Sequence, residues 1–204
     1  MASGFDCVMR FSEYRYLILS DLYRITGNAN LRLLVRYVLF GEAYKYIFWM
    51  RTCQFAHGKR WLKFNIYPVA LFFLNHYKYK FGINIPFEAA IGSGFYIGHF
   101  GGIVVYPYCR IGKNCNLSHG VTLGKTNRGK KAGYPTIGEN VYIGPGAKII
   151  GNIKVGDNVA IGANCVVTND VPDNAVVVGV PGKVISFDGA EGYVCNIDYD
   201  GKID

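Results

Sequence analysis

The chain has 204 residues, half of them hydrophobic and 18% charged, so it can bury a substantial core and is not expected to be disordered. Its 22 Lys and Arg outnumber its 14 Asp and Glu, and no apolar run reaches the ~20 residues of a membrane span. The opening MASGFDCVMR lacks an apolar core, so no signal peptide is expected. The six cysteines form no CxxC pair, which favours a cytoplasmic chain with reduced thiols over a disulfide scaffold.

The N-terminal part of the chain carries the whole net charge. Residues 1–82 hold 12 Lys and Arg against 4 Asp and Glu, whereas residues 83–204 hold 10 of each. This excess of positive charge indicates either a solvated basic face of a helix or a surface that attracts an anionic membrane or an anionic substrate. Nucleic acid is not an expected partner, because no recognition motif accompanies the charge.

Apolar residues in this basic half recur at helical spacing, which predicts several helices within residues 12–81. The loops between them are expected near 27–30, 41 and 57–60. Asn28 or Asn30 can cap the helix that follows, and Pro68 is expected to open another one. The aromatic stripe of this half predicts a hydrophobic core and a subunit interface. Residues 1–82 are therefore expected to form a helical, basic domain.

After residue 83 the period of the aliphatic residues changes to six. Fourteen aliphatic residues recur at this spacing, in three phases: Ile85, Ile91, Ile97, Ile103, Val105, Ile111, Leu117, Leu123, Ile137, Ile143, Ile149, Val155, Ile161 and Val167. Gly directly follows eight of the fourteen. Neither a helix nor an alternating strand has this period, but a hexapeptide repeat does, with 18 residues closing one triangular coil of a parallel β-helix. Stacked coils bury the aliphatic residues in one column. The position four residues after each aliphatic also points inward, which gives Cys115 and Cys165 a structural role.

Two interruptions of the repeat carry information about local structure. The break between Ile103 and Val105 predicts a bulge around Gly101–Gly102. The break between Leu123 and Ile137 leaves room for the basic segment KTNRGKKAGY (125–134), which is expected to form a loop that leaves the prism. Repeat proteins often place function on such insertions.

Four segments carry a resemblance to a known family: IGSGFYIGHFGGIVV (91–105), SHGVTLGKT (118–126), PTIGENVYIGPGAKIIGNIKVGDNVAIGANCVVTNDVP (135–172) and VVGVPGKV (177–184). They resemble the left-handed β-helix acyltransferases, most closely the serine acetyltransferases and their polysaccharide-modifying relatives. The resemblance implies a left-handed β-helix over residues 83–185, followed by a tail (186–204). It also implies transfer of acetyl from acetyl-CoA to a hydroxyl without a metal, by a homotrimer or a dimer of trimers with its active site between neighbouring prisms.

This chemistry requires a general base, because a hydroxyl is a poor nucleophile at neutral pH. His99 lies in the segment that matches the family's catalytic histidine, and it is the expected base. His119 follows twenty residues later, and a coil of 18 residues plus the two-residue break places it beside His99. Fifteen residues before the histidine, where the family has an orienting Asp, this chain has Asn84. Glu88 is the nearest alternative carboxylate.

Substrate recognition departs from the family. The Arg-His pair that holds the serine carboxylate in the family aligns here with Gly133 and Tyr134. Arg128, Lys130 or Lys131 from the loop can replace that clamp. The resemblance also carries over cofactor positions, which are Gly124, Lys125, Pro145 and Ala163 along the pantetheine groove, with Lys148 and Lys183 as point charges for the CoA phosphates.

Three functions are therefore considered. The leading one is an O-acetyltransferase that acts on the hydroxyl of L-serine, a small-molecule acceptor. The second is an O-acetyltransferase for a sugar or surface polysaccharide, for which a basic, aromatic N-terminal half is suited to a membrane surface. The third is a β-helix binding or scaffold protein without catalysis. A metal-dependent hydrase of this fold needs three histidines, and the predicted prism offers two.

Overall fold

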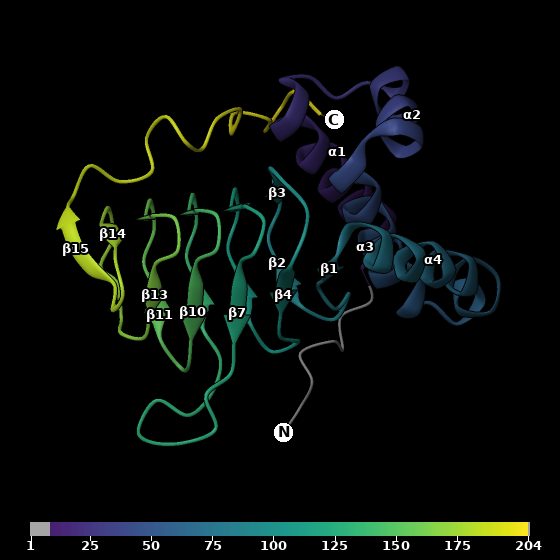
Figure 1. The fold of residues 1–204 in the computed structure, drawn as a ribbon. Helices are drawn as coiled ribbons and strands as arrows, with labels where there is room; N and C mark the ends of the chain where they lie inside the picture. The colour runs from purple at the N-terminus through teal and green to yellow at the C-terminus, as the bar shows by residue number, and fades with distance from the viewer. Residues whose placement is uncertain (1–8, 204) are drawn as a thin grey trace.

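Four helices followed by a three-sided prism of short strands make up residues 9–203, which the computed structural model describes (Figure 1). The helices are α1 (Phe11–Thr26), α2 (Leu31–Phe40), α3 (Glu42–His57) and α4 (Arg60–Phe81). The predicted helices and the loops between them are confirmed. Asn30 is the cap of α2, because its side chain accepts a hydrogen bond of 2.9 Å from the backbone N–H of Leu33.

The expectation for Pro68 is wrong. Helix α4 begins eight residues earlier and continues through Pro68. A proline inside a helix removes one backbone hydrogen bond and is costly in isolation. The packing of α4 along α3 offsets this cost, so tertiary contacts override the local signal.

Three sheets form the faces of the prism. Sheet A contains β1 (Ile83–Asn84), β4 (Ile103–Val105), β7 (Thr122–Gly124), β10 (Lys148–Ile150) and β13 (Val166–Val167). Sheet B contains β2 (Ala90–Ile91), β5 (Arg110–Ile111), β8 (Thr136–Ile137) and β11 (Lys154–Val155). Sheet C contains β3 (Tyr96–Ile97), β6 (Asn116–Leu117), β9 (Tyr142–Ile143), β12 (Ala160–Ile161), β14 (Val176–Val178) and the antiparallel β15 (Lys183–Ser186).

The chain passes from sheet A to B to C and back to A in each coil, so the prism has an A–B, a B–C and a C–A corner. In the first coil Ile83 pairs with Ile103, twenty positions later, whereas in the next coil Val104 pairs with Thr122, eighteen positions later. Gly101 and Gly102 at the first C–A corner take up the two extra residues with φ of 112° and 64°. The predicted bulge is confirmed.

The interior of the prism is the aliphatic column that the repeat predicts. All fourteen repeat aliphatics are buried, and Cys115 and Cys165 are fully enclosed among them. Burial raises the pKa of the Cys115 thiol to about 12 and raises that of Cys165 as well. The structural role expected for these two cysteines is confirmed.

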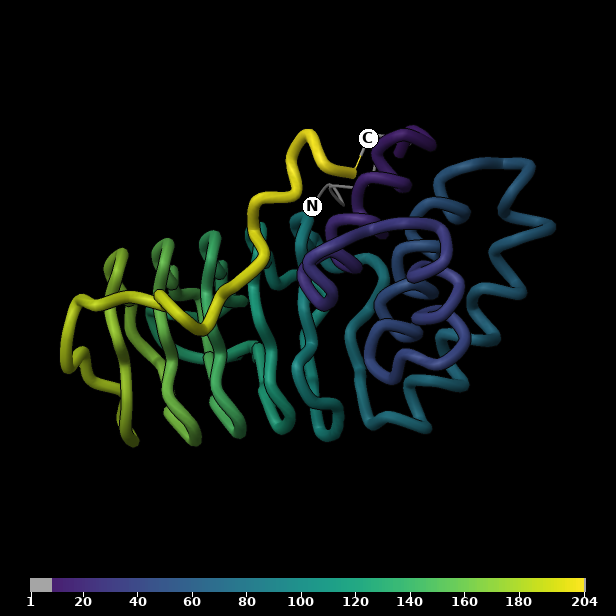
Figure 2. The backbone as a smooth tube through the Cα atoms, turned by 90° about the horizontal axis from the view of Figure 1, so that it is seen from above, coloured from purple at the N-terminus to yellow at the C-terminus, as the bar shows by residue number. Residues whose placement is uncertain are grey.

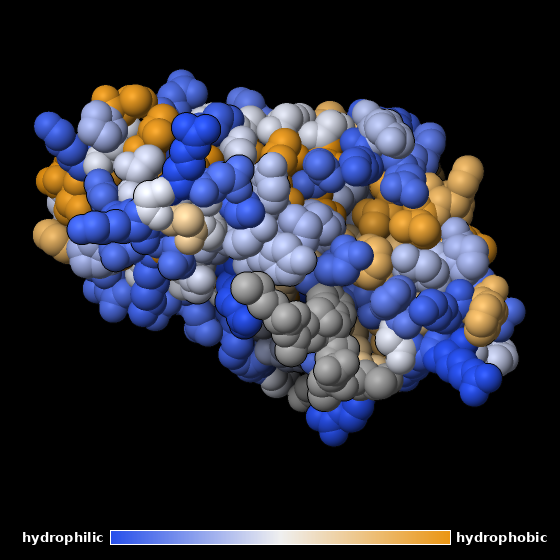
Figure 3. Space-filling model, turned by 90° about the horizontal axis from the view of Figure 1, so that it is seen from below, coloured by the Kyte–Doolittle hydropathy of each residue, from blue (hydrophilic) through white to orange (hydrophobic). Residues whose placement is uncertain are grey.

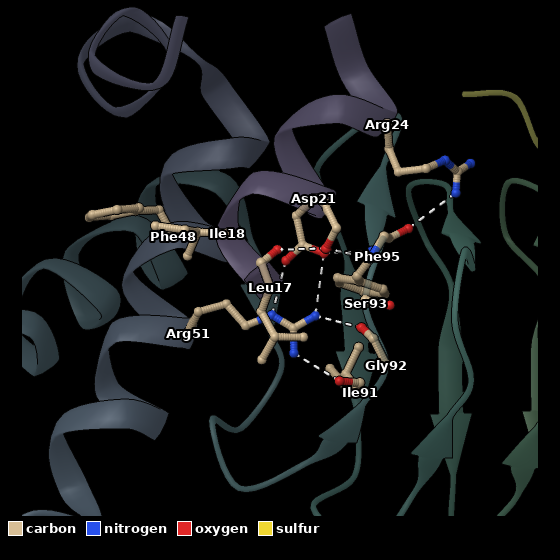
Figure 4. Close-up of polar contacts among 12 residues, drawn as sticks. Leu17, Ile18, Asp21, Arg24, Phe48, Arg51, Ile91, Gly92, Ser93 and Phe95 are labelled. Carbon is tan, nitrogen blue, oxygen red and sulfur yellow. Dashed lines mark hydrogen bonds and ion pairs between the residues drawn. The ribbon is translucent and has the colours of Figure 1, made fainter. Parts of the chain in front are cut away.

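The helices cover the open end of the first coil and are fastened to it by a buried ion pair (Figure 4). Asp21 of α1 and Arg51 of α3 are both fully buried, with Arg51 Nε 2.9 Å from Asp21 Oδ2. Arg51 also donates to the carbonyls of Ile91 and Gly92 at 2.8 and 2.6 Å, and Asp21 accepts the N–H of Phe95 at 2.7 Å. These charge-assisted bonds join the helices to the B–C corner of the prism.

The C-terminal tail returns along the B–C corner from the far end of the prism to the helices (Figure 2). The Tyr199 hydroxyl lies 3.0 Å from Ser93 Oγ and donates to Asn114 Oδ1 at 2.7 Å. Tyr199 and Ile203 are buried against α1. The tail therefore connects both parts of the molecule. Within residues 9–203, none of the helices combines the length and apolarity needed to cross a membrane.

Candidate active site

The two histidines of the prism lie on the outside of the C–A corner. His99 follows β3 and His119 follows β6, and these strands pair so that Ile97 lies opposite Leu117. The ring centroids of the two histidines are 6.1 Å apart, with the ring planes at 76°. Both side chains are exposed. The stacking expected from the coil length is therefore confirmed.

The backbone beside His99 offers hydrogen-bond donors. The ladder bonds to neighbouring coils stop at Gly98 and resume at Ile103. Within residues 9–203, the N–H groups of 99–102 have no backbone acceptor. Free N–H groups next to a general base are suited to stabilise the negative oxygen of a tetrahedral intermediate.

A cavity of about 430 Å³ opens beside His99, between the prism and the helices. Tyr37 of α2 and Glu42 at the start of α3 line one side, and Tyr96 and Phe100 of the first coil line the other. The cavity therefore combines aromatic rings, hydroxyl groups and one carboxylate next to the expected base. No motif or spacing pointed to Tyr37 or Glu42, because only the packing of α2 and α3 against the first coil brings them to His99.

A larger cavity, of about 470 Å³, lies between α1 and sheet B, with Glu13 and Arg110 among its lining residues. It contains none of the residues that the sequence predicts for the site. The smaller cavity is therefore the candidate site, because a cavity that serves acyl transfer must reach the expected base.

The structure places Asn84 and Glu88 differently with respect to His99. Asn84 is exposed on β1, opposite Val104 of the strand that follows the His99 turn. No hydrogen bond joins Asn84 to His99 in the described part of the chain. Glu88 lies at the A–B corner, across sheet A from His99. Burial and then the Glu88 carboxylate raise the pKa of the Cys53 thiol in α3 to about 12. Within one chain, Glu88 therefore does not lie next to His99.

The basic loop leaves the prism at the A–B corner, between β7 and β8. Its ends are pinned by two backbone hydrogen bonds between Thr126 and Gly133, of 3.1 and 2.9 Å. The Lys131 ammonium donates to Thr168 O at 3.1 Å and to Asn169 Oδ1 at 2.6 Å. Lys131 therefore anchors the loop on a later coil, whereas Arg128 and Lys130 are exposed.

Tyr134 closes the base of the loop and is partly buried there. Its ring centroid lies 5.1 Å from that of Tyr108 and 6.1 Å from that of Tyr106. The Lys125 ammonium lies 5.6 Å from the centroid of the Tyr134 ring. Tyr134 is thus part of an aromatic cluster at the A–B corner, on the far side of sheet A from His99.

The positions expected to contact the cofactor fall on both edges of sheet A. Pro145 and Ala163 follow β9 and β12 at the C–A corner, on the coils after His119. Gly124 ends β7, and a Cβ atom there would lie 2.7 Å from the Cδ1 of Ile150. A larger residue at this point would therefore require the Ile150 side chain to move.

The two lysines expected to meet CoA phosphates differ in their surroundings. Lys148 lies on β10 in sheet A, and its ammonium donates to the carbonyl of Gly120, next to His119. Lys183 begins β15 at the far end of the prism and is exposed. Lys183 is therefore the more exposed of the two.

Apart from Asn84 on β1, Lys148 on β10 and Lys183 on β15, the predicted site residues form two columns, separated by the width of sheet A. His99, His119, Pro145 and Ala163 lie at the C–A corner. Glu88, Gly124, Lys125, Arg128 and Tyr134 lie at the A–B corner. The columns of one chain cannot meet, but the C–A corner of one prism can face the A–B corner of another.

Comparison with known proteins gives a consistent picture. Residues 134–169 match the bacterial transferase hexapeptide family (six repeats). A serine acetyltransferase from Staphylococcus xylosus is 47% identical over 108 residues, which are 53% of this chain and 50% of that protein. The chain spans about half the length of the curated relatives it matches.

Solved structures of serine acetyltransferases extend the similarity into the helical half. The enzyme of Brucella abortus strain S19, in complex with coenzyme A, is 32% identical, with a TM-score of 0.65 over 86% of this chain and 68% of that one. The enzyme of Neisseria gonorrhoeae, in complex with serine, is 31% identical, with a TM-score of 0.64 over 86% of this chain and 68% of that one.

Proposed function

This chain belongs to the serine acetyltransferase family of hexapeptide-repeat transferases, and from that membership we propose that it transfers an acetyl group from acetyl-CoA to the hydroxyl of L-serine. His99 is the general base. The observation that carries this proposal is an exposed His99 that borders a cavity and adjoins free backbone N–H groups.

The reaction follows from these groups. The His99 imidazole takes the hydroxyl proton as the hydroxyl oxygen attacks the thioester carbonyl carbon. N–H groups of residues 99–102 stabilise the resulting oxyanion. The carbon–sulfur bond then breaks, and the imidazolium returns the proton to the CoA thiolate. The products are the O-acetyl ester and free CoA, and His99 is neutral again.

A homotrimer completes the site. The two columns of site residues lie at opposite edges of sheet A, so a neighbouring prism has to bring its loop and its Gly124 to the His99 of the first. Cyclic symmetry repeats this contact three times and leaves no site incomplete. The Brucella relative was solved in complex with coenzyme A, which supports acetyl-CoA as the acetyl donor.

A sugar or polysaccharide hydroxyl is the second candidate acceptor. The cavity beside His99 is lined by Tyr37, Tyr96 and Phe100, and aromatic faces with hydroxyl groups are suited to a sugar ring. In addition, Gly133 and Tyr134 stand where the family has the pair that holds the serine carboxylate.

Release of CoA from acetyl-CoA distinguishes these functions. The assay compares L-serine, a panel of sugars and a blank without acceptor, for the wild type, His99→Ala and His76→Ala as an exposed-histidine control. Serine-dependent release that His99→Ala abolishes supports the leading proposal. Release only with sugars replaces serine by the second acceptor. Full activity of His99→Ala refutes the assigned base, and absence of CoA binding refutes acetyl transfer.

A further inference from the structure

Helix α4 exposes a stripe of large apolar side chains. Trp61, Phe64, Phe72 and Tyr79 are 74%, 76%, 68% and 82% exposed. Together with Pro68 they follow one another at intervals of three, four, four and seven residues, which places them on one side of a helix. We call these five residues the α4 stripe. Exposed aromatic residues gathered in this way indicate a contact surface.

Positive charge surrounds the stripe. Around the helix axis, Arg60 and Lys78 lie about 100° to one side of the stripe and Lys80 lies about 100° to the other. No Asp or Glu occurs in the sequence between Glu42 and Glu88, so no carboxylate of α4 neutralises these groups. The helix therefore combines an apolar stripe with basic margins, which is the pattern of helices that lie in the interface of an anionic membrane.

The stripe faces away from the rest of the molecule. Helix α4 is packed on α3 and lies at the outer side of the helical end, away from the prism (Figures 1 and 2). Only Ala70, Leu74 and Phe81 of its 22 residues are buried. Figure 3 shows apolar side chains among hydrophilic ones over this end. Because α4 is not apolar enough to cross a bilayer, such a helix would lie on its surface.

We propose that the α4 stripe and its basic margins bind the surface of a membrane that contains anionic lipid. A second copy of this chain fits the face less well. Two copies would bring together helices that carry only positive charge, and the repulsion between like charges opposes that contact. An anionic lipid surface has the opposite charge and also accepts aromatic rings at the headgroup level.

Membrane contact would bring the active site close to lipid. The Phe81 ring at the end of α4 lies 4.9 Å, between centroids, from the ring of Phe100, which is the neighbour of His99 in the sequence. The C-terminal end of α4 therefore leads to the cavity beside the base. The inference does not depend on acetyl transfer, because it concerns a surface outside the catalytic groups.

Tryptophan fluorescence tests the proposal directly. The chain has two tryptophans, of which Trp49 packs against the core and Trp61 belongs to the stripe. In the full-length Trp49→Phe protein, Trp61 is the only reporter. Vesicles of phosphatidylcholine with phosphatidylserine should shift its emission to the blue, and brominated acyl chains should quench it. Binding to vesicles of phosphatidylcholine alone, measured by the same two signals, should be at least about tenfold weaker.

Two sets of variants separate the contributions, with flotation on the same vesicles as the readout. Phe64→Ala with Phe72→Ala, and Arg60→Gln with Lys80→Gln, should each weaken binding about tenfold or more. Matched controls on the prism, Tyr108→Ala and Lys113→Gln with Lys154→Gln, should not. All of these side chains are exposed, so circular dichroism should show unchanged folding.

Three results would overturn the proposal. The first is no binding to anionic vesicles, and the second is equal binding to neutral and anionic ones. The third is a stripe variant that binds vesicles normally but loses its oligomeric state in light scattering, which would assign the face to a contact between copies.

Discussion

The imidazole rings of His99 and His119 lie 6.1 Å apart on successive coils, although twenty residues separate them in the sequence. Because they share one exposed surface, both are expected to contribute to the same reaction, but unequally. His99→Ala should lower kcat by about 10² to 10⁴, the usual contribution of a general base. His119→Ala should change kcat by about tenfold or less and act mainly on the KM of the acceptor.

A double-mutant cycle measured by CoA release checks this relationship. Because the rings are neighbours, the effect of the double variant should be smaller than the product of the single effects. Independent effects at the two positions would contradict a shared site.

The buried pair of Asp21 and Arg51 should be important for stability. Asp21→Asn leaves the Arg51 charge buried without its carboxylate, which should destabilise the fold by about 3–5 kcal/mol. Urea unfolding followed by circular dichroism measures the change, with the exposed Asp188→Asn as a control that should stay within about 0.5 kcal/mol of the wild type. An unchanged midpoint for Asp21→Asn would show that the ion pair does not hold the helices on the prism.

Anchoring of the basic loop by Lys131 predicts a change in proteolysis. Lys131→Gln removes the charged donor to Thr168 and Asn169, so the loop should open more often. Trypsin should then cut after Arg128 or Lys130 about tenfold faster than in the wild type, as followed by mass spectrometry. The control Lys113→Gln should leave that rate unaltered, and an equal rate in Lys131→Gln would mean that other contacts hold the loop.

The cysteines should differ in reactivity. Burial raises the pKa of Cys115 from 9 to about 12, which lowers its thiolate fraction at neutral pH by about 10³. Cys53 and Cys109 are buried as well, with pKa values raised to about 12 and about 11, whereas Cys195 is exposed. Iodoacetamide in the folded state should modify Cys195 before these three, as read from peptide masses. Early alkylation of Cys115 would contradict a closed prism core.

The pattern of the sequence was sufficient for the architecture. The spacing of six between aliphatic residues determines which side chains point inward, because each coil buries the same positions. It therefore predicts the column of Ile85 to Val167 without any knowledge of distant contacts. The same arithmetic placed His119 beside His99, since coil length alone sets that neighbour. Local chemistry also predicted a cap at Asn28 or Asn30, and the structure selects Asn30.

Only the tertiary structure decided how the helices meet the prism. The cavity at His99 joins Glu42 to a coil more than fifty residues away, and the path of α4 through Pro68 depends on its packing against α3. Glu88 is separated from His99 because Glu88 lies at the A–B corner of its coil and His99 at the C–A corner. Lys131 is anchored by a contact with Asn169, which belongs to a later coil. A repeat determines its own neighbours because its contacts are periodic. Contacts between the helices and the prism have no period, so they are fixed only by how side-chain shapes and buried charges fit together when the chain folds.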